Sequence, residues 1–232
     1  MKKGNKMKIK VFGICTKSYE NIYNDLFLTT MPESLKEDLT VVHLNDIDGI
    51  HGNVMSDEFK RITFKKVELI HQWIKSNIGN VIVFCDLDIV FFRDFKEDIL
   101  NQITNYDMLL HGYDENNYNV GFMAFKCSEK VLKFWSLVVD NFNETKNIYE
   151  YDQVATIDLL KKSDIIHGCL PKQYHCNPIW CNPKITNDIT DTINAIPNDA
   201  FLCHFQAIEQ GEGNKYLIMA ETIKKFNNDN KN

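Results

Sequence analysis

The spacing of apolar and polar positions divides most of the chain into alternating strands and helices. Short runs of apolar and β-branched residues predict strands at 8–15, 40–44, 81–85, 107–111, 120–125 and 201–204, with another near Ile165. Apolar residues spaced three or four apart predict helices at 19–31, 56–76, 128–142 and 152–161, and a last one from Lys215. This alternation predicts an α/β fold with a mainly parallel central sheet and helices on both faces.

Length and composition fit one globular domain. Of the 232 residues, 44% are hydrophobic and 25% are charged, without a repeat or a Pro/Gly/Ser-rich linker. We therefore expect a single domain over residues 1–232, with an ordered core at about 8–226. The net charge of −6 gives no support to nucleic-acid binding. Since no apolar run is long enough to span a membrane and no signal-peptide core follows the first lysines, we expect a cytoplasmic protein.

The cysteines predict neither disulfides nor a zinc site. There are seven, an odd number, and four fall at predicted strand ends, where a reduced cysteine packs as a small hydrophobe: Cys15, Cys85, Cys127 and Cys203. The other three lie near two histidines, but without the paired C-x-x-C spacing that indicates zinc.

The fully apolar strand at 81–85 runs directly into two carboxylates, Asp86 and Asp88. Ionised carboxylates beside a core are costly unless a cation compensates them. A divalent metal does so, and oxygen ligands suit Mg²⁺ or Mn²⁺. We therefore predict that Asp86 and Asp88 hold a metal at an active site. Ligands bind at the carboxyl edge of parallel sheets, where Thr16 also falls, and Asp107 and Asp114 are further acids expected near this pocket.

The strand, Asp86-x-Asp88 and the following Arg93-Asp94 resemble the D-x-D region of GT-A fold glycosyltransferases. The resemblance is strongest to the small nucleotide-diphospho-sugar transferases related to the retaining galactosyl-, glucosyl- and xylosyltransferases. Several motifs that match in the family's order arise by chance less often than a single motif does. Four further segments match in the family's order: Phe64-Lys65-Lys66, Asn119-Val120-Gly121, Tyr151-Asp152-Gln153, and His204 followed by Gly211 and Lys215.

The resemblance implies a transferase that moves a sugar from a nucleotide-diphosphate sugar, most often a UDP-sugar, to a glycan or other hydroxyl acceptor. It implies Mn²⁺ or Mg²⁺, with His204 as the third ligand beside the two aspartates. It places Asp152 and Gln153 beside the reacting sugar. The residues that it places around the donor are Lys65 (in preference to Lys66), Asp86, Asn119, Gly121, Gly211 and Lys215. Thr16, from its position at the sheet edge, is expected at the base or ribose.

The chemistry of the donor agrees with these assignments. A diphosphate leaving group gains negative charge in the transition state, and preorganised positive charge stabilises it. An acidic chain has to supply that charge locally, through a metal and a few lysines. Retention at the anomeric carbon is expected from the resemblance and from the lack of an obvious carboxylate base. After His204 the chain reads Phe205-Gln206-Ala207, which departs from the closing segment usual in the family.

Two other functions fit parts of the same pattern. Asp86-Leu87-Asp88-Ile89-Val90 also matches the D-x-D-x-[TV] motif of haloacid-dehalogenase-type phosphatases, in which the first Asp is a nucleophile. That motif normally opens its domain, and no later G-D-x-x-x-D segment accompanies it here. A non-catalytic module that binds a sugar nucleotide is the second alternative, because a short chain leaves little room for an acceptor site.

Overall fold

The computed structural model describes residues 7–46, 56–112, 117–144, 151–176, 189–206 and 211–229. Its central sheet has the strand order β2-β1-β3-β6-β5-β7. Since β6 pairs antiparallel with both neighbours and every other pair is parallel, β6 alone runs against the rest. The predicted mainly parallel sheet is confirmed. The strands are β1 (Ile9–Thr16), β2 (Leu39–Leu44), β3 (Val81–Cys85), β5 (Met108–Gly112), β6 (Tyr118–Lys126) and β7 (His167–Cys169).

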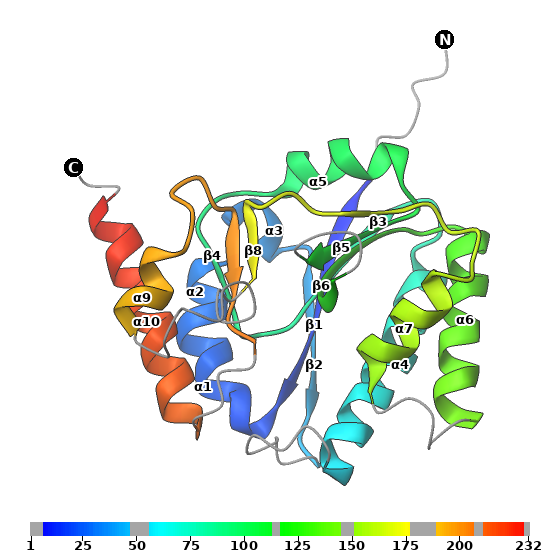
Figure 1. Ribbon diagram of the computed structural model, residues 1–232, viewed down its shortest axis with the longest axis horizontal. Coiled ribbons are helices and arrows are strands. Elements are labelled where there is room, and N and C mark those ends of the chain that lie inside the picture. Colours follow the sequence, from blue (N-terminus) through cyan, green and yellow to red (C-terminus); the bar gives the residue numbers. More distant parts are fainter. Residues whose placement is uncertain are drawn as a thin grey trace.

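Helices cover both faces of this sheet, as expected (Figure 1). One face packs against α4 (Asp57–Ser76), α6 (Glu129–Glu144) and α7 (Asp152–Leu160). The other packs against the helical segment that follows β1 and against α3 (Glu33–Lys36) and α5 (Lys96–Gln102). The segment after β1 consists of short pieces: a 3₁₀ turn (Lys17–Tyr19), α1 (Glu20–Ile22), a π turn (Tyr23–Phe27) and α2 (Leu28–Thr30).

Strand β3 is apolar throughout because it is buried on both sides. Val81, Val83 and Cys85 face the core beneath α3 and α5, whereas Ile82 and Phe84 face the core beneath α4 and α6. The long helix α4 begins as predicted, with the Ser56 hydroxyl accepting the Phe59 N–H at 3.2 Å. This double burial fixes the strand end at which Asp86 emerges.

A second, smaller sheet has the order β4-β9-β8 and lies beside α9 (Ile189–Asn194) and α10 (Gly211–Asp229) (Figure 1). Its strands are β4 (Ile89–Phe91), β8 (Tyr174–Cys176) and β9 (Leu202–His204). Ile89 pairs directly with His204, and the Phe205 N–H donates to the Asp88 carbonyl at 2.8 Å. The small sheet thereby brings the end of the chain to the acid pair.

Several boundaries differ from the predictions. Strand β7 starts at His167 rather than near Ile165, and α10 starts at Gly211 rather than at Lys215. The short elements β4, β8, α5 and α9 were not predicted, because three to seven residues show too little periodicity. Within the described ranges, no helix has the length and apolarity needed to cross a bilayer.

Candidate active site

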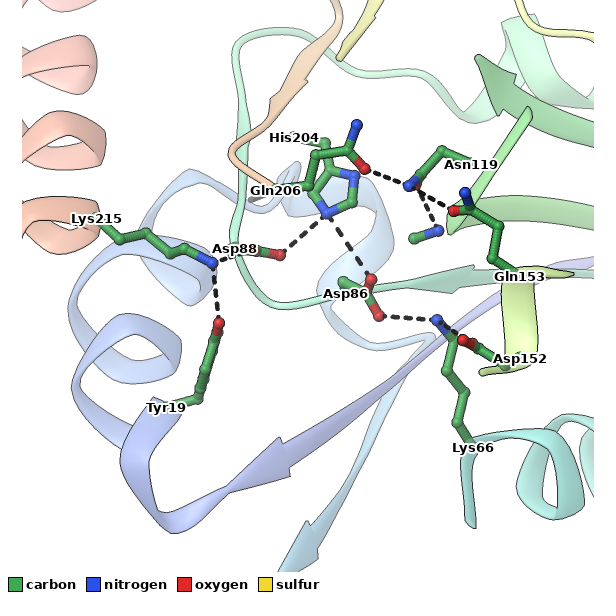
Figure 2. Close-up of polar contacts among 11 residues, drawn as sticks. Tyr19, Lys66, Asp86, Asp88, Asn119, Asp152, Gln153, His204, Gln206 and Lys215 are labelled. Carbon is green, nitrogen blue, oxygen red and sulfur yellow. Dashed lines mark hydrogen bonds and ion pairs between the residues drawn. The ribbon is translucent and has the colours of Figure 1, made fainter. Parts of the chain in front are cut away.

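Asp86, Asp88 and His204 meet beyond the carboxyl end of β3 (Figure 2). The His204 Nε2 lies 3.1 Å from Asp88 Oδ1 and 3.7 Å from Asp86 Oδ2. One ligand atom from each residue lies within 4.8 Å of the others. Two carboxylates and one imidazole facing a common point form a donor set that fits Mg²⁺ or Mn²⁺. The sequence therefore predicted a set of residues that the fold does bring together.

Two lysines reach this acid pair from opposite sides (Figure 2). From α10, the Lys215 ammonium lies 2.6 Å from Asp88 Oδ2 and 3.0 Å from the Tyr19 hydroxyl. From α4, the Lys66 ammonium lies 3.3 Å from Asp86 Oδ1 and 3.0 Å from Asp152 Oδ2. Their side chains are only 13% and 9% exposed, respectively. Asp88 can be buried, and Asp86 partly buried, because these cations compensate them.

The two aspartates differ in their protonation equilibria. Burial tends to raise the pKa of Asp88, but Lys215 and His204 hold that pKa well below its usual range. For Asp86, burial outweighs the attraction of Lys66 and His204, so its pKa is raised. Burial tends to lower the pKa of both lysines, yet their carboxylate partners raise it. The site thus holds both ammonium groups in their charged form.

Gly121 allows the β6 backbone to approach the acid and the imidazole closely. A Cβ at this position would lie 2.6 Å from Asp86 Oδ2 and 2.8 Å from His204 Nδ1, and would overlap the imidazole carbon between the ring nitrogens. The Gly121 carbonyl also accepts the Asp86 N–H at 2.6 Å. Glycine is therefore required here by space.

Three amide side chains, which we call the amide cluster (Asn119, Gln153 and Gln206), are joined through Asn119 (Figure 2). The Asn119 Oδ1 accepts the Gly121 N–H at 2.7 Å. Its Nδ2 donates to Gln153 Oε1 at 3.0 Å and also to Gln206 Oε1. The cluster joins β6, the first turn of α7 and the segment that follows β9.

The preference for Lys65 over Lys66 was wrong. Lys65 lies 42% exposed and pairs with Glu68 at 3.3 Å on the helix surface, whereas Lys66 lies in the site. Helical spacing favours Lys66, since it is four residues from the fully buried Ile70 and therefore shares that face of the helix.

The remaining predicted residues fall at different distances from the site. Thr16 ends β1 at the same sheet edge, with its hydroxyl 3.2 Å from that of Ser18, and Gly211 is the first residue of α10. Asp107 was placed wrongly, since it lies at the opposite end of the sheet and pairs with Lys130. Asp114 lies outside the described residues.

Tyr19 and Gln206 were not predicted as site residues. Tyr19 lies three residues beyond the last residue of β1, and nothing in the sequence distinguishes it from other tyrosines. Gln206 stood out only as a departure from the family pattern.

Comparison with known proteins identifies the family. A model of the nucleotide-diphospho-sugar transferase family matches residues 31–217. The chain belongs to this family. Its membership decides against the phosphatase interpretation, in which Asp86 would be a nucleophile. A search of curated protein sequences finds no match.

Solved glycosyltransferases share the fold of this family member. One involved in glycosylation of the major capsid of PBCV-1 superimposes with a TM-score of 0.62 at 12% identity, covering 92% of this chain and 98% of that one. Mouse xyloside xylosyltransferase 1 superimposes with a TM-score of 0.54 at 10% identity, and the match covers 87% of this chain and 98% of that one. The glycosyltransferase GlyE of Streptococcus pneumoniae TIGR4 superimposes with a TM-score of 0.55 at 12% identity, and the match covers 95% of this chain and 64% of GlyE. The expected GT-A fold is confirmed.

Proposed function

We propose that this chain is a single-domain, metal-dependent glycosyltransferase that moves a sugar from a UDP-sugar to a hydroxyl acceptor with retention. The observation that carries the proposal is the meeting of Asp86, Asp88 and His204 with two buried lysines. In a chain of net charge −6, this cluster concentrates the cationic side chains that a diphosphate needs.

Asp86, Asp88 and His204 would hold Mn²⁺ or Mg²⁺, which when bound supplies positive charge to the donor diphosphate. Lys215 is placed to add a second positive charge. An ammonium group has three N–H donors, and among the residues that the structure describes Asp88 and Tyr19 accept two of them. The third can go to a phosphate oxygen. Thr16, at the edge of the sheet beyond β1, is assigned to the base or ribose.

Asp152 and Gln153 are assigned to the donor sugar. Lys66 links Asp152 to Asp86, so the first turn of α7 is held beside the acid pair. Asp152 and Gln153 therefore adjoin the place where the diphosphate would meet the sugar. As sugar-hydroxyl partners they would orient the anomeric carbon toward the acceptor.

Retention requires the acceptor to attack on the face from which the diphosphate departs. The bond from the anomeric carbon to the diphosphate oxygen breaks, and the bond to the acceptor oxygen forms. Since Lys66 already engages the Asp152 carboxylate at 3.0 Å, we assign the acceptor's proton to the departing diphosphate oxygen. NMR of the product decides this assignment, because an inverted anomer would contradict it.

A thermal-shift screen of nucleotide sugars, with and without Mn²⁺, tests the donor. A ligand at 100 times its Kd stabilises the folded state by about 2.7 kcal/mol, which for a chain of this size raises Tm by about 5 °C or more. We expect such a shift with a UDP-sugar only when Mn²⁺ is present. Equal shifts without the metal, or none with any nucleotide sugar, would contradict the proposal.

Turnover separates the enzyme from a non-catalytic binding module. We expect the stabilising UDP-sugar to release UDP in the presence of Mn²⁺ and a panel of sugar acceptors. Tight binding without UDP release across the whole panel would favour the module.

A further inference from the structure

The three residues proposed to hold the metal come from two different sheets. Asp86 directly follows β3 of the central sheet, whereas Asp88 directly precedes β4 and His204 ends β9, both in the small sheet. The 3.7 Å between His204 Nε2 and Asp86 Oδ2 therefore depends on how the two sheets are placed against each other (Figure 2). A site with ligands on both sheets needs contacts that hold the sheets in a fixed relation.

His111 on β5 makes such a contact. Its side chain is fully buried, and its Nε2 lies 2.7 Å from the backbone carbonyl oxygen of Tyr174 on β8. Since a carbonyl oxygen can only accept, the Nε2 of His111 carries a proton and donates it. Tyr174 is itself anchored, because its hydroxyl donates to Asp98 Oδ2 on α5 at 2.6 Å. His111 thus ties the central sheet to a fixed point of the small sheet.

The pairing of β5 with β6 becomes irregular at His111. Up to Leu110 the two strands pair residue by residue, and at His111 the pairing skips residues 120–122 of β6. Irregularities of this kind change the direction in which a side chain points. Gly121, the middle residue of those skipped, is the one whose backbone lies against His204. The same irregularity therefore contributes both the close approach of β6 and the position of His111.

His111 also packs against the ring of His204. The two imidazole planes are 27° apart, and their centroids are separated by 5.8 Å. Metal-bound histidines are usually oriented by a hydrogen bond at their second ring nitrogen. Among the residues that the structure describes, none hydrogen-bonds to the buried Nδ1 of His204. The orientation of His204 therefore depends on the groups packed around its ring, and His111 is one of them.

We infer that His111 is a positioning residue for His204: by donating to the Tyr174 carbonyl, it holds the imidazole where it can share a divalent ion with the two aspartates. His111 acts through His204 and itself binds neither the ion nor the donor. An apolar ring of the same size could pack against His204 but could not make this hydrogen bond. The inference rests on the proposed function and names a residue that supports its metal site.

Two substitutions separate the hydrogen bond from the packing. His111→Phe keeps a ring beside His204 and removes the N–H donor, whereas His111→Gln removes the ring and keeps an N–H donor at a similar reach. The measurement is the Mn²⁺ affinity of the full chain in the presence of UDP, by calorimetric titration. His71→Phe is the matched control, because His71 Nε2 lies 3.0 Å from the Ser136 hydroxyl and this contact joins α4 to α6.

We expect His111→Phe to lower the Mn²⁺ affinity about tenfold and His111→Gln to stay within about threefold of the wild type. His71→Phe should bind Mn²⁺ like the wild type. An unchanged affinity in His111→Phe, an equal loss in His111→Gln, or the same loss in His71→Phe would overturn the inference alone. A wild type that binds no Mn²⁺ in the presence of UDP would overturn the proposed function itself.

His111→Asn provides the comparison if His111→Phe does not fold. Its amide is one bond shorter than that of His111→Gln and stops short of the Tyr174 carbonyl. We therefore expect His111→Asn to bind Mn²⁺ about tenfold more weakly than His111→Gln. Equal Mn²⁺ affinities in the two amide variants would contradict a role for the hydrogen bond.

Discussion

Ion pairs occur at both ends of the central sheet, and the lysines of these pairs differ in burial. At the carboxyl end of β3, Asp86 and Asp88 are compensated by Lys66 and Lys215, with lysine side chains 9% and 13% exposed. At the opposite end, Asp107 pairs with Lys130 at 2.8 Å, and that lysine is 35% exposed. A pair at the rim is screened by water and adds little to stability. Buried charges are costly to assemble, so their concentration at one edge indicates a site built for a charged ligand.

The largest expected effect comes from removing one metal-holding carboxylate. Asp88→Asn removes the negative charge that His204 and Lys215 share, and replaces one carboxylate oxygen with an amide nitrogen that cannot bind the metal. We expect sugar transfer, measured as UDP release with Mn²⁺, to fall about 10³-fold, or about 4 kcal/mol in transition-state stabilisation.

Asp158→Asn is the matched control for this change, because Asp158 pairs with Lys162 on the surface of α7 and the substitution removes the same charge. It should keep wild-type activity. A comparable loss in both variants would show that net charge, rather than the site, sets the rate.

The next largest effect is on folding stability and separates two adjacent lysines. Lys66→Met leaves the buried Asp152 and the partly exposed Asp86 without their cation, so we expect the free energy of unfolding to fall by about 3 kcal/mol. Lys65→Met removes only an exposed pair with Glu68 and should cost less than about 1 kcal/mol. Urea unfolding at pH 7 measures both. If the two variants lost equal free energy of unfolding, the greater burial of Lys66 would not contribute to stability, and the expectation would be contradicted.

A smaller effect is expected from one methyl group placed against the metal-holding residues. Gly121→Ala puts a Cβ into the space of His204 and Asp86, so we expect Mn²⁺ affinity in the presence of UDP to fall about tenfold. In Gly13→Ala, the new Cβ lies 3.1 Å from the end of the Leu87 side chain and 3.3 Å from the Cys85 carbonyl oxygen, so a shift of a few tenths of an ångström accommodates it. That variant should bind Mn²⁺ like the wild type. Calorimetry provides both affinities, and an undiminished affinity in Gly121→Ala would contradict the proposed position of the ion.

The smallest effect concerns the rim pair and its pH dependence. Burial tends to raise the pKa of Asp107, but hydrogen bonds from Lys130 and the Ile166 N–H lower it below its usual value. The ionised form therefore stabilises the fold above the unfolded-state pKa of about 3.9, and this contribution is lost as pH falls through the lower folded pKa. Asp107→Asn should be slightly less stable than the wild type at pH 7.

Urea unfolding between pH 7 and pH 3 checks this expectation. The difference between the two proteins should narrow below about pH 4, because the wild-type carboxylate then becomes protonated. UDP affinity should not change. If the difference in unfolding free energy between the two proteins grew toward pH 3, the stabilising role assigned to the ionised Asp107 carboxylate would be contradicted.

Much of the fold could be predicted because its central elements carry strong patterns. Strand β3 was predicted with its observed limits, since burial on both faces demands an uninterrupted apolar run. Helix α4 was predicted from the three- and four-residue spacing of its apolar positions. The small sheet was predicted only in β9, because the three-residue strands β4 and β8 owe their existence to tertiary pairing rather than to local pattern.

Site residues could be predicted from the sequence where they belong to a motif. They could not be predicted where only the three-dimensional fold brings them to the site. Asp86, Asp88 and His204 came from strand-end acids and from ordered resemblance. Tyr19 and Gln206 could not be predicted, since their roles arise from which segments the fold places side by side. Lys66 is an intermediate case, because its position on the helix could be read from the sequence although Lys65 was preferred for the role.

The central claim is that Asp86, Asp88 and His204 hold one divalent ion at the donor site. Pulsed EPR of Mn²⁺ bound together with UDP tests it most directly, because a metal-bound imidazole nitrogen couples to the electron spin. The account predicts nitrogen coupling in the wild type and its loss in His204→Asn. Bound Mn²⁺ without such coupling in the wild type, or with the same coupling in His204→Asn, would contradict it.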